Sequence, residues 1–189
     1  MEVDLRTMLS VGDRRTLGRV AEVVAWFEQS GARVEPLVEL LWDSDPGVRM
    51  RAADALEKLS RTNPTVLHPW KAELLGLLLD AQQAELLWHL EQMAARVELT
   101  ADERRRLMRR LRNLVNNPSS IVKTNALQAM WDLSQGHAAL RAEMVEFFSA
   151  VTGTNAGSLL EFEEGPVRVT AAMRSRARLL LNKGLHDGC

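Results

Sequence analysis

The feature that most constrains the fold is a segment that recurs along the chain at a regular distance. Residues 48–59, VRMRAADALEKL, reappear 74 residues later at 122–133, VKTNALQAMWDL, with a Val, a cation, two Ala and a Leu in place. Half of that shift predicts another copy near Glu85, and a shift of 38 aligns the apolar positions of 86–97 with those of 48–59. A fourth echo is MRSRA at 173–177. Recurrence at this period is typical of stacked helix pairs.

Each copy has the pattern of an amphipathic helix. In the first copy, five apolar residues at three- and four-residue spacing form one face: Val48, Ala52, Ala55, Leu56 and Leu59. The same periodicity continues through a chain rich in Leu, Ala, Glu and Arg, and no stretch indicates a sheet. The sequence therefore predicts an all-α protein. The nine expected helices cover about 15–29, 35–42, a segment from 46, a segment from 64, 83–97, 101–115, 119–134, 138–151 and 167–183.

Start and stop signals support these boundaries. Asp45 is followed by Pro46, so an N-cap and a proline at the first helical position open the helix of the first copy, and Asn63-Pro64 repeats the device. Thr100 and Glu103 have the spacing of a capping box. Gly31 is expected to end the first predicted helix.

One insertion interrupts the period. The fourth copy follows the third by 51 residues instead of 37, and the surplus matches 152–165, TGTNAGSLLEFEEG. This segment is expected either to fold back on its own array or to act as an arm that binds a partner or another copy. The expected layout is one domain over 1–189, with repeats over about 34–183 and a tail at 184–189.

The period, the helix pairs and the motif Asp-x-x-Pro-x-Val-Arg before Ala-Ala-x-Ala-Leu-x-x-Leu resemble HEAT repeats, as found in small bacterial HEAT-repeat proteins. The resemblance is strongest at 43–59 and good at 118–133. It implies a right-handed α-solenoid of about four helix pairs behind an extra N-terminal helix. Stability in such arrays comes from contacts between neighbouring repeats.

The resemblance also implies a ladder of polar contacts between repeats. Asp43 and Arg49 match its acidic and basic positions, and Asn117 and Lys123 are a softened version. Leu87 stands where the second copy needs its cation, so the ladder is interrupted there. On the helical wheel, Arg49 and Arg51 point toward opposite neighbouring helices.

The second helices of a HEAT array line its concave face, so residues opposite each apolar face are expected to meet a partner. These residues are Met50, Asp54, Glu57, Trp88, Gln92, Thr124, Gln128 and Trp131. Two tryptophans within a polar surround have the layout of a binding hot spot. The alternative is that each indole ring is mostly buried. The function expected from this layout is a non-catalytic scaffold module for another protein.

A second candidate surface is the arginine cluster of ERRRLMRRLRN. Its apolar stripe leaves Arg105, Arg106, Arg109 and Arg112 facing outward. The cluster is either a solvated convex face or a polyanion patch, in which case binding would fall steeply with salt. The alternative function is therefore a nucleic-acid-binding module. HEAT-like alkylpurine DNA glycosylases resemble the chain in architecture, so they are the enzymes to which this alternative would relate it.

Composition and missing motifs narrow the remaining classes. The net charge is −1, so the whole chain has no overall attraction to nucleic acid or anionic membranes. The sequence has no metal-binding His or Cys spacing, no phosphate loop and no segment like a signal peptide or membrane span. Its single cysteine, Cys189, cannot form an intrachain disulfide. We therefore expect no metal, no cofactor, no catalytic residues and a cytoplasmic location.

Overall fold

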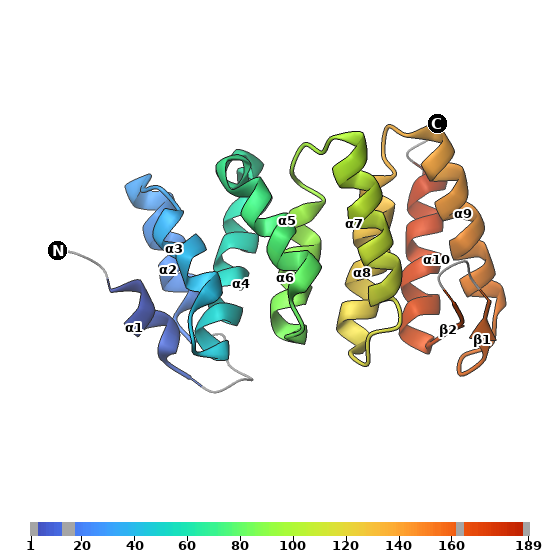
Figure 1. Ribbon diagram of the computed structural model, residues 1–189, viewed down its shortest axis with the longest axis horizontal. Coiled ribbons are helices and arrows are strands. Elements are labelled where there is room, and N and C mark those ends of the chain that lie inside the picture. The colour runs from blue at the N-terminus through green and yellow to red at the C-terminus, as the bar shows by residue number, and fades with distance from the viewer. Residues whose placement is uncertain (1–3, 13–17, 162–164, 187–189) are drawn as a thin grey trace. The chain divides into compact units, whose positions relative to one another are not determined.

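The computed structural model describes residues 4–12, 18–161 and 165–186 (Figure 1). Over these residues the chain forms ten α-helices, two 3₁₀-helices and one small two-stranded sheet, which confirms the all-α class. The chain divides into two compact units, Met1–Glu98 (unit 1) and Leu99–Cys189 (unit 2). Each unit is described by itself.

Unit 1 is organised around one long helix. Its elements are α1 (Leu5–Ser10), α2 (Val20–Ser30), α3 (Glu35–Glu39), η1 (Leu40–Trp42), α4 (Pro46–Thr62), η2 (Pro64–Trp70), α5 (Lys71–Asp80) and α6 (Ala84–Ala94). Helix α4 packs against α1, α2, α3, η1, η2 and α6. Almost every residue from Val48 to Ser60 is therefore buried, including charged ones.

Unit 2 consists of packed helices and a small β-hairpin. It contains α7 (Ala101–Leu114), α8 (Ser120–Leu133), α9 (Ala138–Gly153), β1 (Leu159–Leu160), β2 (Val167–Arg168) and α10 (Ala171–His186). Helix α8 packs against α7, α9 and α10, and α10 packs against both α8 and α9. The core of the unit lies where α8, α9 and α10 meet, around Trp131, Phe148 and Met173.

Two of the predicted helix starts are confirmed by their caps. At Asn63-Pro64, by contrast, Asn63 forms no side-chain cap hydrogen bond, and Pro64 opens the 3₁₀-helix η2. The Asp45 side chain accepts a hydrogen bond from the Gly47 backbone N–H at 2.7 Å, and Pro46 is the first residue of α4. Thr100 and Glu103 form both hydrogen bonds of the capping box at α7. Gly31 ends α2 with φ 62°, a left-handed conformation that glycine adopts without steric cost.

Three boundaries differ from the prediction. The insertion forms a β-hairpin, in which Leu159 pairs with Arg168 and Leu160 with Val167, so the expectation of no sheet is wrong here. Helix α10 consequently begins at Ala171 instead of 167 and continues to His186, into the expected tail. Helix α1 was not expected, and α2 begins at Val20, whereas part of the predicted 15–29 helix lies outside the described residues.

The hairpin lies back on its own unit through its second strand. Val167 and Val169 are buried, and the Asn116 side-chain amide donates to the Pro166 carbonyl at 3.1 Å. Leu159 on the first strand remains 54% exposed. The part of the insertion at 162–164 lies outside the described residues.

Candidate functional site

The residues predicted to line a binding face are divided by their burial. Met50, Asp54 and Glu57 are 5%, 4% and 0% exposed, and Trp131 is 1% exposed. Side chains this inaccessible do not contact a partner, so the expectation that these four point outward is wrong. The wheel describes one helix, whereas α4 and α8 are surrounded by neighbours on several sides.

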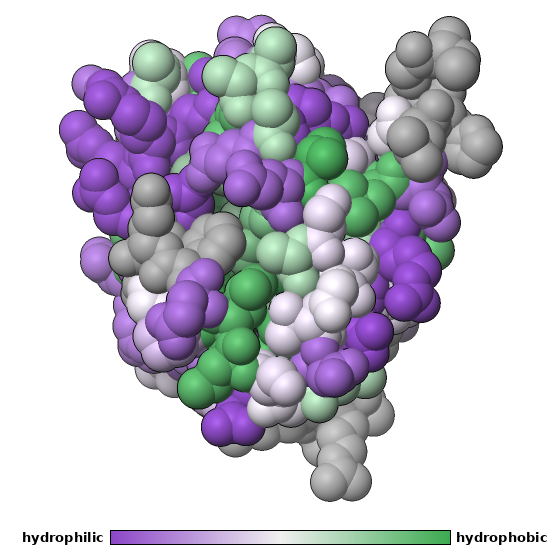
Figure 2. Space-filling model, turned by 90° about the vertical axis from the view of Figure 1, so that its right-hand side faces the viewer, coloured by the Kyte–Doolittle hydropathy of each residue, from purple (hydrophilic) through white to green (hydrophobic). Residues whose placement is uncertain are grey.

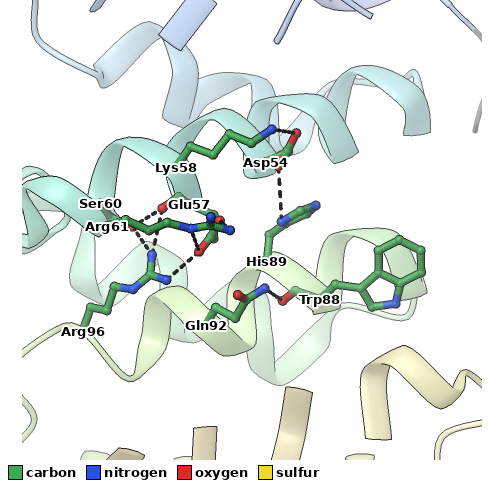
Figure 3. A network of polar contacts seen from close by, with 9 residues as sticks. All are labelled: Asp54, Glu57, Lys58, Ser60, Arg61, Trp88, His89, Gln92 and Arg96. Atoms are coloured by element: carbon green, nitrogen blue, oxygen red, sulfur yellow. Dashed lines mark hydrogen bonds and ion pairs between the residues drawn. The ribbon is translucent and has the colours of Figure 1, made fainter. Parts of the chain in front are cut away.

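The other predicted positions are half-buried: Trp88, Gln92, Thr124 and Gln128. Their polar groups have partners within their own unit. Gln92 donates to the Trp88 carbonyl at 2.8 Å, and Gln128 donates to Asp132 at 2.9 Å and accepts from Arg176 at 3.0 Å. The Trp88 ring extends away from the neighbouring polar cluster (Figure 3). A role for these four residues in binding stays a prediction.

Trp131 belongs to the core of unit 2. Its ring stacks on Phe148 with centroids 5.6 Å apart, and the Arg141 guanidinium lies 3.4 Å from its centroid. Gly184 of α10 lies so close that an added Cβ would be 2.7 Å from Cζ2 of the indole. The ring therefore holds α8, α9 and α10 together.

Asp54 and Glu57 belong to a buried ion network between α4 and α6 (Figure 3). Lys58 Nζ lies 2.7 Å from Asp54 Oδ2. Glu57 Oε1 accepts from Arg61 at 2.9 Å and from Arg96 at 2.5 Å. Arg96 also donates to the Glu57 carbonyl at 2.8 Å and to Ser60 Oγ at 2.7 Å, so one arginine holds the C-terminal turn of α4.

Within the described residues, Asp54, Glu57 and His89 place one ligand-type atom each within 4.8 Å of one another. Such a group raises the question of a metal site. Glu57 already pairs with Arg61 and Arg96, and Asp54 pairs with Lys58. The two carboxylates thus have three cations as partners, and a divalent ion would add positive charge to a site that already has an excess of it. We therefore interpret the group as a structural ion network.

Burial and charge shift the titration of this network in two ways. Burial alone would raise the pKa of Glu57, but the hydrogen bonds and charges of Arg61 and Arg96 outweigh it and hold this pKa below 4.5. Burial lowers the pKa of His89 below 6.5, against the opposing charges of Asp54 and Glu57. His89 Nδ1 is buried without a hydrogen bond and lies 3.9 Å from Asp54 Oδ1.

The residues of the predicted ladder make other contacts than a pair between the Asp43 and Arg49 side chains. Arg49 donates to the Asp43 carbonyl at 2.7 Å and to Gln83 Oε1 at 2.9 Å, so it connects the start of α4 to the start of α6. The Asp43 carboxylate is instead bound by Arg6 of α1 at 2.7 Å. Arg51 donates to the Leu9 carbonyl at 2.9 Å, so Arg49 and Arg51 do point toward opposite neighbours.

The softened copy of the ladder has a different local role. Asn117 Oδ1 accepts from the Ser119 backbone at 2.8 Å, within the turn that starts α8. Lys123 is 7% exposed, and burial together with the charge of Arg168 lowers its pKa. Within the described residues, no hydrogen bond joins Asn117 to Lys123.

The arginine cluster of α7 lines a groove in unit 2, which we call the arginine groove. Its volume is about 490 Å³, and it lies between α7 and the start of α9. The lining residues are Ala101, Arg104, Arg105, Met108, Arg109, Arg112, His137, Ala139, Leu140 and Glu143. Of the four predicted patch residues, Arg105, Arg109 and Arg112 line the groove, and Arg106 lies on α7 outside it.

Positive charge dominates this groove. Arg105 pairs with Asp102 and Arg112 with Glu143, whereas the exposed Arg109 has no acidic partner among the described residues. Four arginines face one glutamate across an apolar floor that includes Met108 and Leu140. The groove can therefore hold a ligand that combines carboxylate or phosphate groups with an apolar side.

The α9 side of the groove was not identified from the sequence. Leu140 and Glu143 follow the arginines by roughly one repeat period, and this spacing was the only signal that could have paired the two helices. His137 precedes α9 in the turn after α8. A helical wheel of α7 alone could not show that α9 lies beside the α7 arginines and forms a groove with them.

Known proteins give no assignment for the arginine groove, so its assignment rests on the geometry described above. No described helix is both long and apolar enough to cross a membrane. A search of family models, of curated proteins and of solved structures finds no match to the chain.

Proposed function

We propose that this protein is a non-catalytic binding module that holds an acidic segment of another protein in the arginine groove. The observation that carries the proposal is the unbalanced charge of the lining: Arg104, Arg105, Arg109 and Arg112 against Glu143. Guanidinium groups bind carboxylates through paired, charge-assisted hydrogen bonds. Arg109 is exposed and has no acidic partner among the described residues, so it is ready to make such a contact.

The apolar floor favours a peptide with two faces. Met108 and Leu140 lie among the arginines, and a groove between two helices is a common site for an amphipathic helix or an extended segment. Acidic side chains would meet the arginine rim, while apolar side chains would cover the floor. Charge would set the orientation, and the apolar contact would add affinity that salt does not screen.

The architecture we propose is a right-handed α-solenoid of HEAT-like helix pairs. Helices α4 and α6, which carry the first two copies of the recurring segment, pack against each other, as do α8 and α10, which carry the last two. Contacts between successive copies are what a repeat array requires. In such an array the arginine groove lies between first helices of neighbouring pairs, a different surface from the concave face that the sequence indicated.

Nucleic acid is the second candidate ligand, and the positive charge of unit 2 supports it. Residues 99–189 contain 13 Lys and Arg and 9 Asp and Glu, a net charge of +4. The groove lining has no Trp or Phe on which a nucleic-acid base could stack, and His137 is the one aromatic side chain among its lining residues. A glycosylase-like activity is therefore less well supported than peptide binding, because a glycosylase must hold the target base outside the DNA base stack.

Fluorescence anisotropy with three labelled probes tests the proposal. The probes are an amphipathic Glu/Leu peptide, its Lys/Leu counterpart and a short DNA duplex. We expect the acidic peptide to bind, the basic one to fail, and Arg109→Ser to weaken binding about tenfold, since a charge-assisted hydrogen bond contributes roughly 1.5–3 kcal/mol.

Arg106→Ser is the matched control, because Arg106 is an exposed arginine of the same helix outside the groove. Equal losses from both variants would indicate general charge attraction and contradict the groove. Tight duplex binding that disappears with salt, together with no peptide binding, would favour the nucleic-acid function instead.

A further inference from the structure

An acidic surface with an exposed tryptophan lies on α3 and η1 of unit 1. Glu35, Glu39 and Trp42 are all exposed, and their spacing of four and three places them on one side of the helical segment. Trp42 is 51% exposed, although tryptophan side chains are highly buried on average. We call these three residues the acidic face.

A basic surface with an exposed leucine lies on α10 of unit 2. Leu179 is 63% exposed, and Arg178 and Lys183 are exposed beside it. The sequence of α10 contains no Asp or Glu. Figure 2 shows that the side of unit 2 on the right of Figure 1 has hydrophobic surface between hydrophilic residues. We call Arg178, Leu179 and Lys183 the basic face.

The two faces complement each other in charge and in apolar character. Each has one large exposed apolar side chain flanked by two like charges, acidic on one face and basic on the other. The same opposition holds for whole units, because residues 1–98 contain 11 Lys and Arg and 16 Asp and Glu, a net charge of −5, against +4 for residues 99–189. Opposite fields of this kind accelerate and orient association.

We propose that the acidic face of one copy of this chain binds the basic face of a second copy. The contact is heterologous, because it joins different surfaces. An assembly that does not close into a ring therefore keeps a free acidic face at one end and a free basic face at the other. Where no ring closes, further copies can add at both ends, and the association weakens with salt. This inference is independent of the arginine groove, whose residues lie on neither face.

Sedimentation velocity of the full chain over a concentration series tests the proposal. We expect the wild type to form species larger than a dimer as concentration rises, and to return toward monomer at high salt. Leu179→Glu and Trp42→Ser should each weaken association at least tenfold. Both side chains are exposed, so the helical circular dichroism should not change. Ile121→Glu, at a side chain 49% exposed on α8, is the control and should associate like the wild type.

A mixture of the two variants gives the decisive measurement. Leu179→Glu keeps an intact acidic face and Trp42→Ser keeps an intact basic face, so an equimolar mixture should form dimers and nothing larger. A wild type that stays monomeric at every concentration overturns the proposal. So does a Trp42→Ser variant that associates alone as strongly as the wild type, because the acidic face would then not be needed for the contact. Arg109→Ser should leave self-association unchanged even if it abolishes peptide binding.

Discussion

Glu57 and Trp131 occupy equivalent positions 74 residues apart, and each is held by an arginine that also binds the serine three residues later. Arg96 donates to the Glu57 carboxylate and carbonyl and to Ser60 Oγ. Arg141 lies on the Trp131 ring and donates to its carbonyl at 3.5 Å and to Ser134 Oγ at 3.2 Å. The same helix turn is therefore fastened by an ion pair in unit 1 and by a cation–π contact in unit 2.

Replacing Trp131 by Ala should destabilise the protein strongly. Large buried aromatic residues cost about 3–5 kcal/mol when truncated to alanine, and this ring contacts Phe148, Arg141 and Gly184. Urea unfolding followed by circular dichroism measures the change. Trp42→Ala, at an exposed ring, should stay within about 0.5 kcal/mol of the wild type. A small effect at both positions would show that Trp131 is not a core residue.

Gly184 and Gly76 should respond to alanine in opposite directions. A Cβ at Gly184 would lie 2.7 Å from the Trp131 ring, so Gly184→Ala should destabilise the fold by about 1–3 kcal/mol through overpacking. A Cβ at Gly76 meets nothing within 4 Å, so Gly76→Ala in α5 should stabilise it by about 0.5–1 kcal/mol through helix propensity. Thermal melts of both variants check the pair, and a shift of the same sign in both would contradict the packing described for Gly184.

Much of the helical pattern could be predicted, because apolar spacing and caps act within a few residues. The capping box at Thr100 and the Asp45-Pro46 start depend on local hydrogen bonds that the sequence states directly. The burial of Trp131 could not be predicted in this way, since it depends on α9 and α10 closing over α8. The hairpin was missed because each strand has two residues, too few to show alternation.

The candidate site shows the same limit. The arginines of α7 were identified, but the groove needs Leu140 and Glu143 of α9, and nothing in α7 indicates them. Glu57 was expected in a binding surface because it lies opposite the apolar face of α4. Arg61 from its own helix and Arg96 from beyond α6 bury it instead. Contacts between helices decide which side chains are buried, and a helical wheel of one helix does not include them.

Acid should destabilise unit 1 through His89 as the pH falls below 6.5. Burial lowers the pKa of His89 in the folded state below 6.5, so above pH 6.5 neither state binds a proton there. Below pH 6.5 the unfolded state binds one first, and the free energy of unfolding falls by at most about 1.4 kcal/mol per pH unit. His89→Gln should flatten this slope between pH 6.5 and 5, as measured by urea unfolding at each pH. An unchanged slope in His89→Gln would contradict the assignment of this pH dependence to His89.

Arg96→Met and Arg141→Met should differ in how their cost depends on pH. At pH 7 Arg96→Met leaves the buried Glu57 carboxylate with one fewer cation, and breaking a buried pair costs about 3–5 kcal/mol. Without Arg96, Arg61 alone opposes the effect of burial, so the pKa of Glu57 is higher than in the wild type. Protonation then relieves the buried charge at a higher pH than in the wild type, and the difference between the two shrinks as pH falls. The contacts that Arg141 makes with the indole ring, the Trp131 carbonyl and Ser134 Oγ involve no titrating group, so their loss in Arg141→Met should cost about 1–2 kcal/mol at either pH. Urea unfolding of both variants at pH 7 and pH 4.5 makes the comparison. Equal pH dependence in the two variants would show that Arg96 acts through Ser60 and the Glu57 carbonyl alone.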